Sequence, residues 1–417
     1  MKRILIAISI LAFTNALLAQ RPTQELRFND FLRIVLANNL DLIIEQYEVS
    51  AAEAALAASR VFEDPELEMI SPMFDNDDFS GFPRNISFEL EVPIELFGKR
   101  RYRIRQARAE KYAAEATFDD FLRHLRAEAA TTYIEVLAHQ RIVERMNITL
   151  EQLNQLIDIN KALYEVGEIG EIDLIQTRIE ARNHQAELFD VLADYTELLG
   201  DVYFLMGRRT TDSLVFMGDP VMKATIANFD DLLNQTITTR SDILAAQHRV
   251  NAHEFAIRLA RAERLPNISL IAGYHNEEAL RPSPGFPVMY AGVVIPLTFS
   301  GFNRGEFRLS QIEFEQSQTE LKATILDAEV GLHSAWNKHR LLSQKRLLFT
   351  ESILQDAEKV RDAIVYSYQR GDVSLLEVLE AQRTMNETYM NYYETLSNYA
   401  KSLTELSKVS GQWLIDF

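Results

Sequence analysis

Cysteine is absent from all 417 residues of the chain. Disulfide bonds are therefore excluded, and packing or association with other copies must hold the protein together. The same absence excludes a lipid-anchored form of an exported protein, because no cysteine is available to carry the lipid.

The chain also lacks a long hydrophobic run. After residue 19 no stretch of 18 apolar residues occurs, so no transmembrane helix is expected. The apolar run Ile4–Phe13 is too short to span a bilayer, which takes about 20 residues. It follows Lys2 and Arg3 and precedes Ala19, an order typical of a secretory signal peptide. We therefore predict a signal peptide over residues 1–19, with the cut located to within a residue or two.

Basic residues are in deficit. The chain has 43 Lys and Arg against 61 Asp and Glu, a formal net charge of −18. Removal of Lys2 and Arg3 with the signal peptide leaves 41 basic residues and a net charge of −20. Nucleic-acid binding needs a basic face that neutralises phosphates, so this composition excludes nucleic acid as an expected partner.

Glycine and proline are missing between Arg101 and Tyr164. An uninterrupted helix of this length would measure roughly 95 Å, far beyond a globular helix of about 11–12 residues. The segment 302–368 is similar and contains only Gly305 and Gly331. Further helical patterns cover residues 28–60, 172–206, 229–261 and the C-terminal segment around 385–406, where apolar residues follow heptad spacing.

Residues 86–96 form the clearest strand pattern. Every even position is apolar and every odd position is Ser, Glu or Pro. Such a period of two gives a strand one apolar face and one polar face. Other strand patterns occur at 66–69, 267–274 and 288–297. We therefore expect a mainly α protein with a small β part of four strands.

The same plan occurs twice along the chain. Gly167 corresponds to Gly371, and Asp173 to Glu377, at a constant offset of 204 residues. In each copy a glycine ends one long helix and a carboxylate stands in the first turn of the next. We predict two structural repeats of the plan helix, strand, strand, long helix, tip, helix: residues 20–211 and residues 212–417.

Motifs for catalysis are absent. No phosphate-binding glycine loop, nucleophile elbow or His-Asp-Ser grouping occurs, and the eight histidines are scattered without zincin spacing. The acids Asp75, Asp77 and Asp78 are followed by Phe79 and Ser80, which break the calcium-loop pattern. We expect no enzyme, no cofactor and no specific metal site.

Four strands are too few to close a barrel. If the apolar strand faces meet lipid, several chains must pool their strands, since an open sheet edge is not tolerated there. Three chains would give twelve strands, an even number in the range of outer-membrane barrels.

Taken together, these features resemble the TolC family of outer-membrane efflux channels over the whole mature chain. The resemblance rests on the two Tyr-x-x-Gly tips with an acid six residues after the glycine, the Gly98-Lys99-Arg100 turn after the alternating strand, and the 204-residue repeat. Residues 94–100 are further similar to the heavy-metal-resistance, CzcC-like branch of the family.

The resemblance implies a homotrimer. Each chain would give four strands to one shared 12-stranded outer-membrane β-barrel and long antiparallel coiled-coil hairpins to a periplasmic α-barrel. Such a protein would be the passive exit duct of a tripartite efflux pump in the cell outer membrane, surrounded by outer-membrane lipid. Its partners would be a periplasmic adaptor (membrane fusion) protein and an inner-membrane transporter of the RND type, and its substrates would include heavy-metal cations.

Two alternative functions stay open at this point. One is the outer-membrane component of a type I secretion system. The other is a periplasmic coiled-coil scaffold without a pore, although a scaffold gives no reason for six apolar residues on one strand face. The sequence identifies neither the transported substrate, nor the cognate pump, nor the resting state of the channel.

The resemblance also implies roles for the tips. It assigns the periplasmic aperture to four residues: Asp173, Glu377, Glu380 and Tyr368. It assigns the tip turns and adaptor docking to Gly167, Gly170, Gly371 and Ser374. In a trimer each aperture carboxylate would become a ring that attracts cations. The alternative interpretation is that the acids only complement helix N-termini. Val373 replaces an arginine of the family's best-known member, so no latch through that arginine is expected.

Five strand acids alternate with apolar residues: Glu66, Glu68, Glu89, Glu91 and Glu95. The resemblance implies that they line the barrel lumen. The alternative interpretation is the solvated side of an ordinary sheet, which needs the same geometry.

Overall fold

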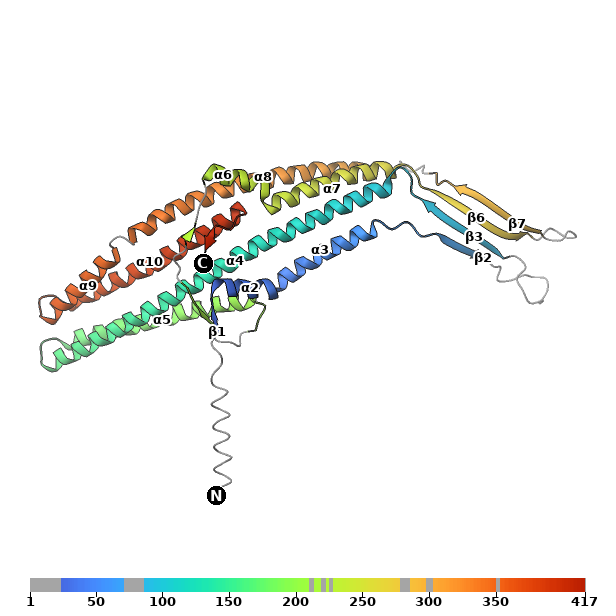
Figure 1. Cartoon of the computed structure of the whole chain (residues 1–417). Coiled ribbons are helices and arrows are strands. Elements are labelled where there is room, and N and C mark those ends of the chain that lie inside the picture. Colours follow the sequence, from blue (N-terminus) through green and yellow to red (C-terminus); the bar gives the residue numbers. More distant parts are fainter. Residues whose placement is uncertain are drawn as a thin grey trace, which may run out of the picture. The chain divides into compact units, whose positions relative to one another are not determined.

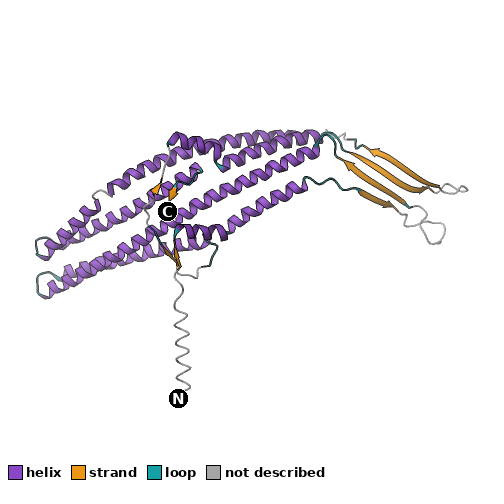
Figure 2. Ribbon diagram, viewed as in Figure 1, coloured by secondary structure: helices purple, strands orange, loops and turns teal. Residues whose placement is uncertain are grey.

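The computed structural model describes residues 24–70, 86–209, 214–218, 223–224, 228–277, 286–297, 303–349 and 353–416. The predicted signal peptide and the acidic segment 75–78 lie outside these residues. Helices dominate and strands are few, which confirms the predicted mainly α fold with a small β part (Figure 2). No helix in the described ranges has an apolar stretch long enough to cross a bilayer.

The chain divides into two compact units, and each combines segments from both halves of the sequence. The first, here called the helical unit, comprises residues 1–45, 120–240 and 327–417. The second, here called the sheet unit, comprises residues 46–119 and 241–326. The predicted repeats, residues 20–211 and 212–417, describe the order of elements along the chain and do not correspond to these compact units. The boundary between the repeats stays a prediction.

The sheet unit contains a four-stranded antiparallel sheet in the order β2-β3-β6-β7 (Figure 1). Its strands are β2 (Glu66–Ile70), β3 (Ser87–Ile94), β6 (Ile268–Glu277) and β7 (Phe286–Val294). All four correspond to strand patterns in the sequence. Within the described residues, one edge of β2 and one edge of β7 have no strand beside them.

The helices are α2 (Phe28–Asn38), α3 (Leu40–Ala58), α4 (Lys99–Glu165), α5 (Glu171–Leu205), α6 (Phe229–Thr239), α7 (Ser241–Glu263), α8 (Arg304–Leu348), α9 (Leu354–Gln369) and α10 (Leu375–Ser410). The 67 residues of α4 form one helix, as the absence of glycine and proline predicts. Hairpin α4–α5 and hairpin α9–α10 are the two helical hairpins expected from the repeat.

Two predicted helices are interrupted. Residues 28–60 form α2 and α3, separated at Asn39, whose backbone is extended and whose side-chain oxygen accepts a bond of 2.9 Å from the Leu42 N–H. Residues 229–261 are divided in the same way at Arg240, which donates to the Val409 carbonyl over 3.1 Å. Neither break contains glycine or proline, so local sequence did not reveal them.

The segment 302–368 is described as two helices, and residues 350–352 between them lie outside the described residues. Helix α8 ends at Leu348 and α9 begins at Leu354.

Four short strands were not predicted: β1 (Gln24–Leu26) pairs in parallel with β4 (Leu214–Phe216), and β5 (Lys223–Ala224) pairs antiparallel with β8 (Ile415–Asp416). Strands this short carry no periodic signal.

An aromatic cluster forms part of the core of the helical unit. Tyr133 of α4 packs against Phe28, Phe31 and Phe216 with ring centroids 5.4–5.8 Å apart. Its hydroxyl donates to the Met217 carbonyl over 2.7 Å. Burial raises the pKa of Tyr133 to about 12. The contacts attach α2 and β4 to the middle of α4.

Gly207, just after α5, is a position where a side chain cannot be accommodated. Its φ is +60°, and an added Cβ would lie 2.3 Å from the Asn38 carbonyl oxygen. We predict that Gly207→Ala lowers the free energy of unfolding by about 2 kcal/mol or more, because the left-handed backbone alone costs about 1–2 kcal/mol. The melting temperature followed by circular dichroism would measure this.

Gly200 supplies the matched control. It lies inside α5, and nothing stands within 4 Å of a Cβ added there. Gly200→Ala should leave the melting temperature unchanged or raise it, since alanine favours a helix over glycine by up to about 1 kcal/mol. Equal melting temperatures for the two variants would contradict the role given to Gly207.

Candidate functional site at the helical hairpin tips

The two hairpin tips have the same backbone design. Gly167 and Gly371 have φ of +85° and +78°. In the first tip the Glu168 N–H donates to the Leu163 carbonyl over 2.9 Å, and in the second the Asp372 N–H donates to the Ser367 carbonyl over 3.0 Å. A glycine with positive φ and this long-range bond make a Schellman turn, which satisfies the last carbonyls of a helix.

A carboxylate begins the outgoing helix of each tip. The Gly170 N–H donates to an Asp173 carboxylate oxygen over 3.3 Å. The Ser374 N–H and hydroxyl donate to one Glu377 oxygen over 2.8 and 3.2 Å. Both acids therefore accept a bond from the backbone N–H of the residue that precedes the helix, which is the acid's half of a capping box. This is the helix-start role that the sequence left open as an alternative. Glu380 is exposed one turn later on α10.

Tyr368, at the end of α9, joins the two hairpins. The side chain is buried, and its hydroxyl donates to the Asn160 side-chain oxygen over 2.8 Å. The Asn160 amide nitrogen donates in turn to the Thr177 hydroxyl over 2.7 Å. Helices α9, α4 and α5 are thus linked through three buried polar side chains. Burial raises the pKa of Tyr368, and the nearby Asp173 charge raises it further, so the hydroxyl remains a proton donor.

Apolar residues surround this polar link. The cluster comprises Leu153, Leu156, Ala181, Leu375, Val378 and Leu379 together with the Tyr368 ring. In such surroundings an unpaired hydroxyl or amide costs about 1–3 kcal/mol. The link therefore favours one relative position of the hairpins.

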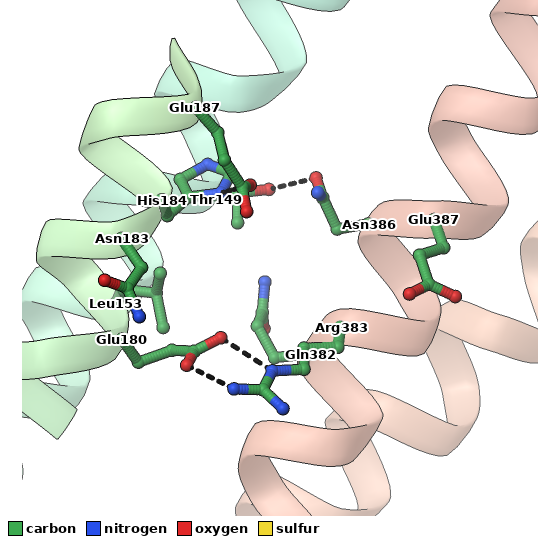
Figure 3. Close-up of a pocket in the computed structure, with 10 residues that line it drawn as sticks. All are labelled: Thr149, Leu153, Glu180, Asn183, His184, Glu187, Gln382, Arg383, Asn386 and Glu387. Atoms are coloured by element: carbon green, nitrogen blue, oxygen red, sulfur yellow. Dashed lines mark hydrogen bonds and ion pairs between the residues drawn. The ribbon is translucent and has the colours of Figure 1, made fainter. Parts of the chain in front are cut away.

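A second contact between the hairpins lies further along α5 and α10 (Figure 3). Arg383 donates to both oxygens of Glu180 over 2.8 and 2.6 Å, a bidentate ion pair. Gln382 donates to Gln152 over 3.0 Å. Glu180, Gln382 and Arg383 line a cavity of about 350 Å³ between the helices.

The Glu180–Arg383 pair has a defined pH range. The hydrogen bond from Arg383 lowers the pKa of the Glu180 carboxyl. A carboxyl whose pKa is depressed on folding stabilises the fold above its ordinary pKa of about 4.3, and this contribution is lost as the pH falls through the depressed value. The pair is therefore intact at neutral pH.

A cation–π contact continues the interface along α10. The guanidinium of Arg145, on α4, lies 3.9 Å from the ring centroid of Tyr389 on α10. The Tyr389 hydroxyl donates to Glu358 of α9. Burial and this bond raise the pKa of Tyr389 to about 12. Three helices again meet through polar groups rather than through aliphatic packing alone.

In the sheet unit, strand acids stand opposite each other. Glu66 pairs in register with Glu91, and Glu68 with Glu89. Like charges placed directly opposite destabilise a strand pair, so these four acids are not explained by sheet stability. Glu95 differs from them, because it follows β3 and its buried carboxylate pairs with Arg103 over 2.8 Å.

Tyr290 of β7 reaches across the sheet. Its hydroxyl donates to the Glu89 carboxylate on β3, over the intervening strand β6. The ring lies where a side chain on Gly273 would stand, since a Cβ there would be 2.3 Å from the ring. The absence of a side chain at Gly273 therefore allows the Tyr290 ring to lie across β6 and reach Glu89.

The sequence predicted some of these residues and missed others. Tyr368 and the tip glycines were predicted, whereas Asn160, Thr177, Glu180 and Arg383 were not. Asn160 had a signal, because it interrupts the apolar series Leu153, Leu156, Leu163 on α4. Glu180 and Arg383 are 203 residues apart and had none. No group of three His, Asp or Glu side chains suited to a metal ion occurs within the part of the chain that the structure describes.

Comparison with known proteins gives the context for this geometry. The family model described as "Outer membrane efflux protein" matches residues 32–208 and again residues 232–412. The cobalt-zinc-cadmium resistance protein CzcC of Cupriavidus metallidurans is 21% identical over 91% of this chain and 89% of its own length. The cation efflux system protein CusC of Escherichia coli K12 is 28% identical over 42% of this chain and 39% of its own length.

Solved structures share the fold. A crystal structure of CusC superposes with a TM-score of 0.77 at 18% identity and covers 92% of both chains. The outer-membrane channel OprN gives a TM-score of 0.75 at 16% identity, covering 92% of this chain and 89% of its own. The fold is that of these outer-membrane channels, and the resemblance found in the sequence is confirmed. With both halves of its sequence matched by the family model, the chain belongs to the outer membrane efflux protein family.

Proposed function

We propose that the protein is the passive exit duct of a tripartite efflux pump that exports heavy-metal cations. It is not an enzyme, as its relatives and structural neighbours are efflux channels. In this proposal three copies assemble in the outer membrane, a periplasmic adaptor docks on the tips at Gly167, Gly170, Gly371 and Ser374, and an RND-type inner-membrane transporter delivers the substrate.

The observation that carries the proposal is the polar link between the hairpins at their tips. A duct that opens and closes needs a contact stable enough to hold the tips and weak enough to release them. The Tyr368–Asn160–Thr177 link meets both needs, because a net hydrogen bond contributes only about 0.5–1.5 kcal/mol. Docking of another protein on the tips can exceed that energy.

Charge supports a cationic substrate. Asp173, Glu377 and Glu380 gather near the tips, and three copies would bring nine such carboxylates to one opening. The capping bonds of Asp173 and Glu377 come from backbone N–H groups and from the Ser374 hydroxyl. Neither acid forms an ion pair with a cationic side chain in the described structure. Two relatives are named for cobalt-zinc-cadmium resistance and for cation efflux.

The sheet supports assembly. Within the described residues, its two outer edges present unpaired backbone groups, which other copies would satisfy. In the proposed 12-stranded barrel Glu66, Glu68, Glu89 and Glu91 face the water-filled lumen, while Phe88, Leu90 and Val92 face lipid.

We predict that Tyr368→Phe raises the open probability of the channel in planar bilayers. The change removes one hydrogen bond and leaves the Asn160 oxygen buried and unpaired, which weakens the closed arrangement by about 1–3 kcal/mol. Tyr366→Phe is the control, because Tyr366 lies on the same helix with its side chain 61% exposed. Identical gating of the two variants would show that the Tyr368–Asn160–Thr177 link takes no part in gating.

We predict that Glu377→Gln with Glu380→Gln reduces the cation-to-anion permeability ratio by a factor of about two to five, since up to six charges leave the opening. Glutamine is chosen because it can still serve at the third position of a capping box. Reversal potentials in a salt gradient measure the ratio. Glu387→Gln with Glu394→Gln makes the same charge change further along α10, and an equal effect from this pair would show that position at the tip is irrelevant.

We predict that Leu90→Arg lowers the yield of trimer, measured by native mass spectrometry in detergent. An arginine on the lipid face near the bilayer midplane costs about 2–4 kcal/mol. Glu89→Arg, on the opposite face of the same strand, should assemble normally. A wild-type mass of one or two chains would refute the trimer, and equal losses in the two variants would refute the assignment of faces.

A further inference from the structure

Basic residues concentrate where the helices of the sheet unit join the strands. Six of the ten residues from Lys99 to Arg108 are basic and none is acidic, in a chain with a net charge of −18. Arg258, Arg261 and Arg264 lie at the end of α7, and Arg304 and Arg308 at the start of α8. We call these three segments, Lys99–Arg108, Arg258–Arg264 and Arg304–Arg308, the basic belt.

Side-chain contacts hold the belt segments together. Lys99 at the start of α4 donates to the Leu265 carbonyl after α7 over 2.6 Å. Arg261 and Arg264, from the end of α7, lie 5.9 and 5.6 Å from the ring centroid of Phe307 at the start of α8. The belt is therefore one surface rather than three separate sequence features.

Some belt residues have a role within the fold. Arg100 donates to the Arg60 carbonyl over 2.6 Å, and Arg103 donates to the Ser59 carbonyl over 3.3 Å. Both cap the C-terminal end of α3, where a positive charge is favourable. Lys99 does the same after α7. These three residues are explained by local stability.

Arg101, Arg304 and Arg308 are not explained in this way. All three are exposed, and the described residues place no carboxylate within ion-pair distance of them. Arg101 and Arg304 stand in the first turn of α4 and α8, where a positive charge opposes the helix dipole. Arg304 and Arg308 are also four residues apart on one helix, a spacing at which like charges repel. The fold is therefore made less stable by their charges.

Exposed apolar side chains accompany these arginines. Phe62, Phe97, Leu265 and Leu297, in the connections between helices and strands, are 66%, 52%, 45% and 71% exposed. The guanidinium of Arg100 lies 4.0 Å from the Phe62 ring centroid. Aromatic and aliphatic side chains mixed with basic ones are the composition that suits the boundary between lipid tails and headgroups.

We propose that the basic belt binds the headgroups of anionic phospholipids on the side of the membrane from which the helices emerge. The inference rests on the proposed function, in which the sheet lies in the membrane. The belt directly adjoins β3 and β6, which places it at the level of the headgroups when the strands cross the bilayer. A second copy is a poorer occupant, because it brings the same excess of positive charge.

The test is native mass spectrometry of the full-length protein titrated with phosphatidylglycerol or phosphatidylethanolamine. The wild type should bind phosphatidylglycerol at least about tenfold more tightly than phosphatidylethanolamine, since each basic side chain at an anionic surface raises the affinity about fivefold. Arg101→Gln, Arg304→Gln and Arg308→Gln combined should abolish most of that preference. The control removes three exposed arginines of the helical unit instead, Arg33→Gln, Arg178→Gln and Arg182→Gln, and should keep it.

Two results would overturn the proposal. One is an unchanged preference for phosphatidylglycerol in the belt variant. The other is dissociation of the belt variant into single chains that retain the preference, which would assign the arginines to an interface between copies. Conductance of the wild type in planar bilayers separates this inference from the proposed function: a conducting channel without lipid preference refutes the belt alone, whereas the absence of any channel refutes the duct.

Discussion

Buried polar side chains must find partners, and this requirement governs how the two helical hairpins meet. Asn160 satisfies it with Tyr368 on one side and Thr177 on the other. Further along the hairpins, the buried Arg145 repeats the solution with Tyr389 of α10. The more exposed ion pair of Glu180 with Arg383 adds another specific contact. An interface built from aliphatic packing alone would discriminate less between alternative registers, because it has no polar groups that must be paired. This one has specific partners and modest net energy, which is what the proposed gating at the tips requires.

Sequence reasoning succeeded where the signal is local. Strict alternation located β3, the absence of glycine and proline located α4, and the two tip glycines marked the turns. It failed where a distant residue decides. Asn39 breaks a helix because its amide reaches Leu205, and Arg240 does so beside Val409. Glu180 and Arg383 are 203 residues apart in sequence and meet only because the two hairpins pack together. No pattern in a single sequence shows how the hairpins pack.

Charge is distributed unevenly within each of the two units. Acids gather near the tips and on one face of the sheet, whereas the basic belt lies between the strands and the helices of the sheet unit. Several of these charges oppose local stability: carboxylates face each other across β2 and β3, and arginines begin α4 and α8. Charges that a fold tolerates against its own stability are the ones most readily assigned to a function.

The contact of Tyr290 with Gly273 has a consequence for how this sheet can vary among related chains. Because the ring occupies the space in which a side chain at 273 would stand, any larger residue there requires a shorter one at position 290. That exchange would remove the hydroxyl from Glu89 and leave its carboxylate free to turn. Positions 273 and 290, on the adjacent strands β6 and β7, should therefore change together or not at all.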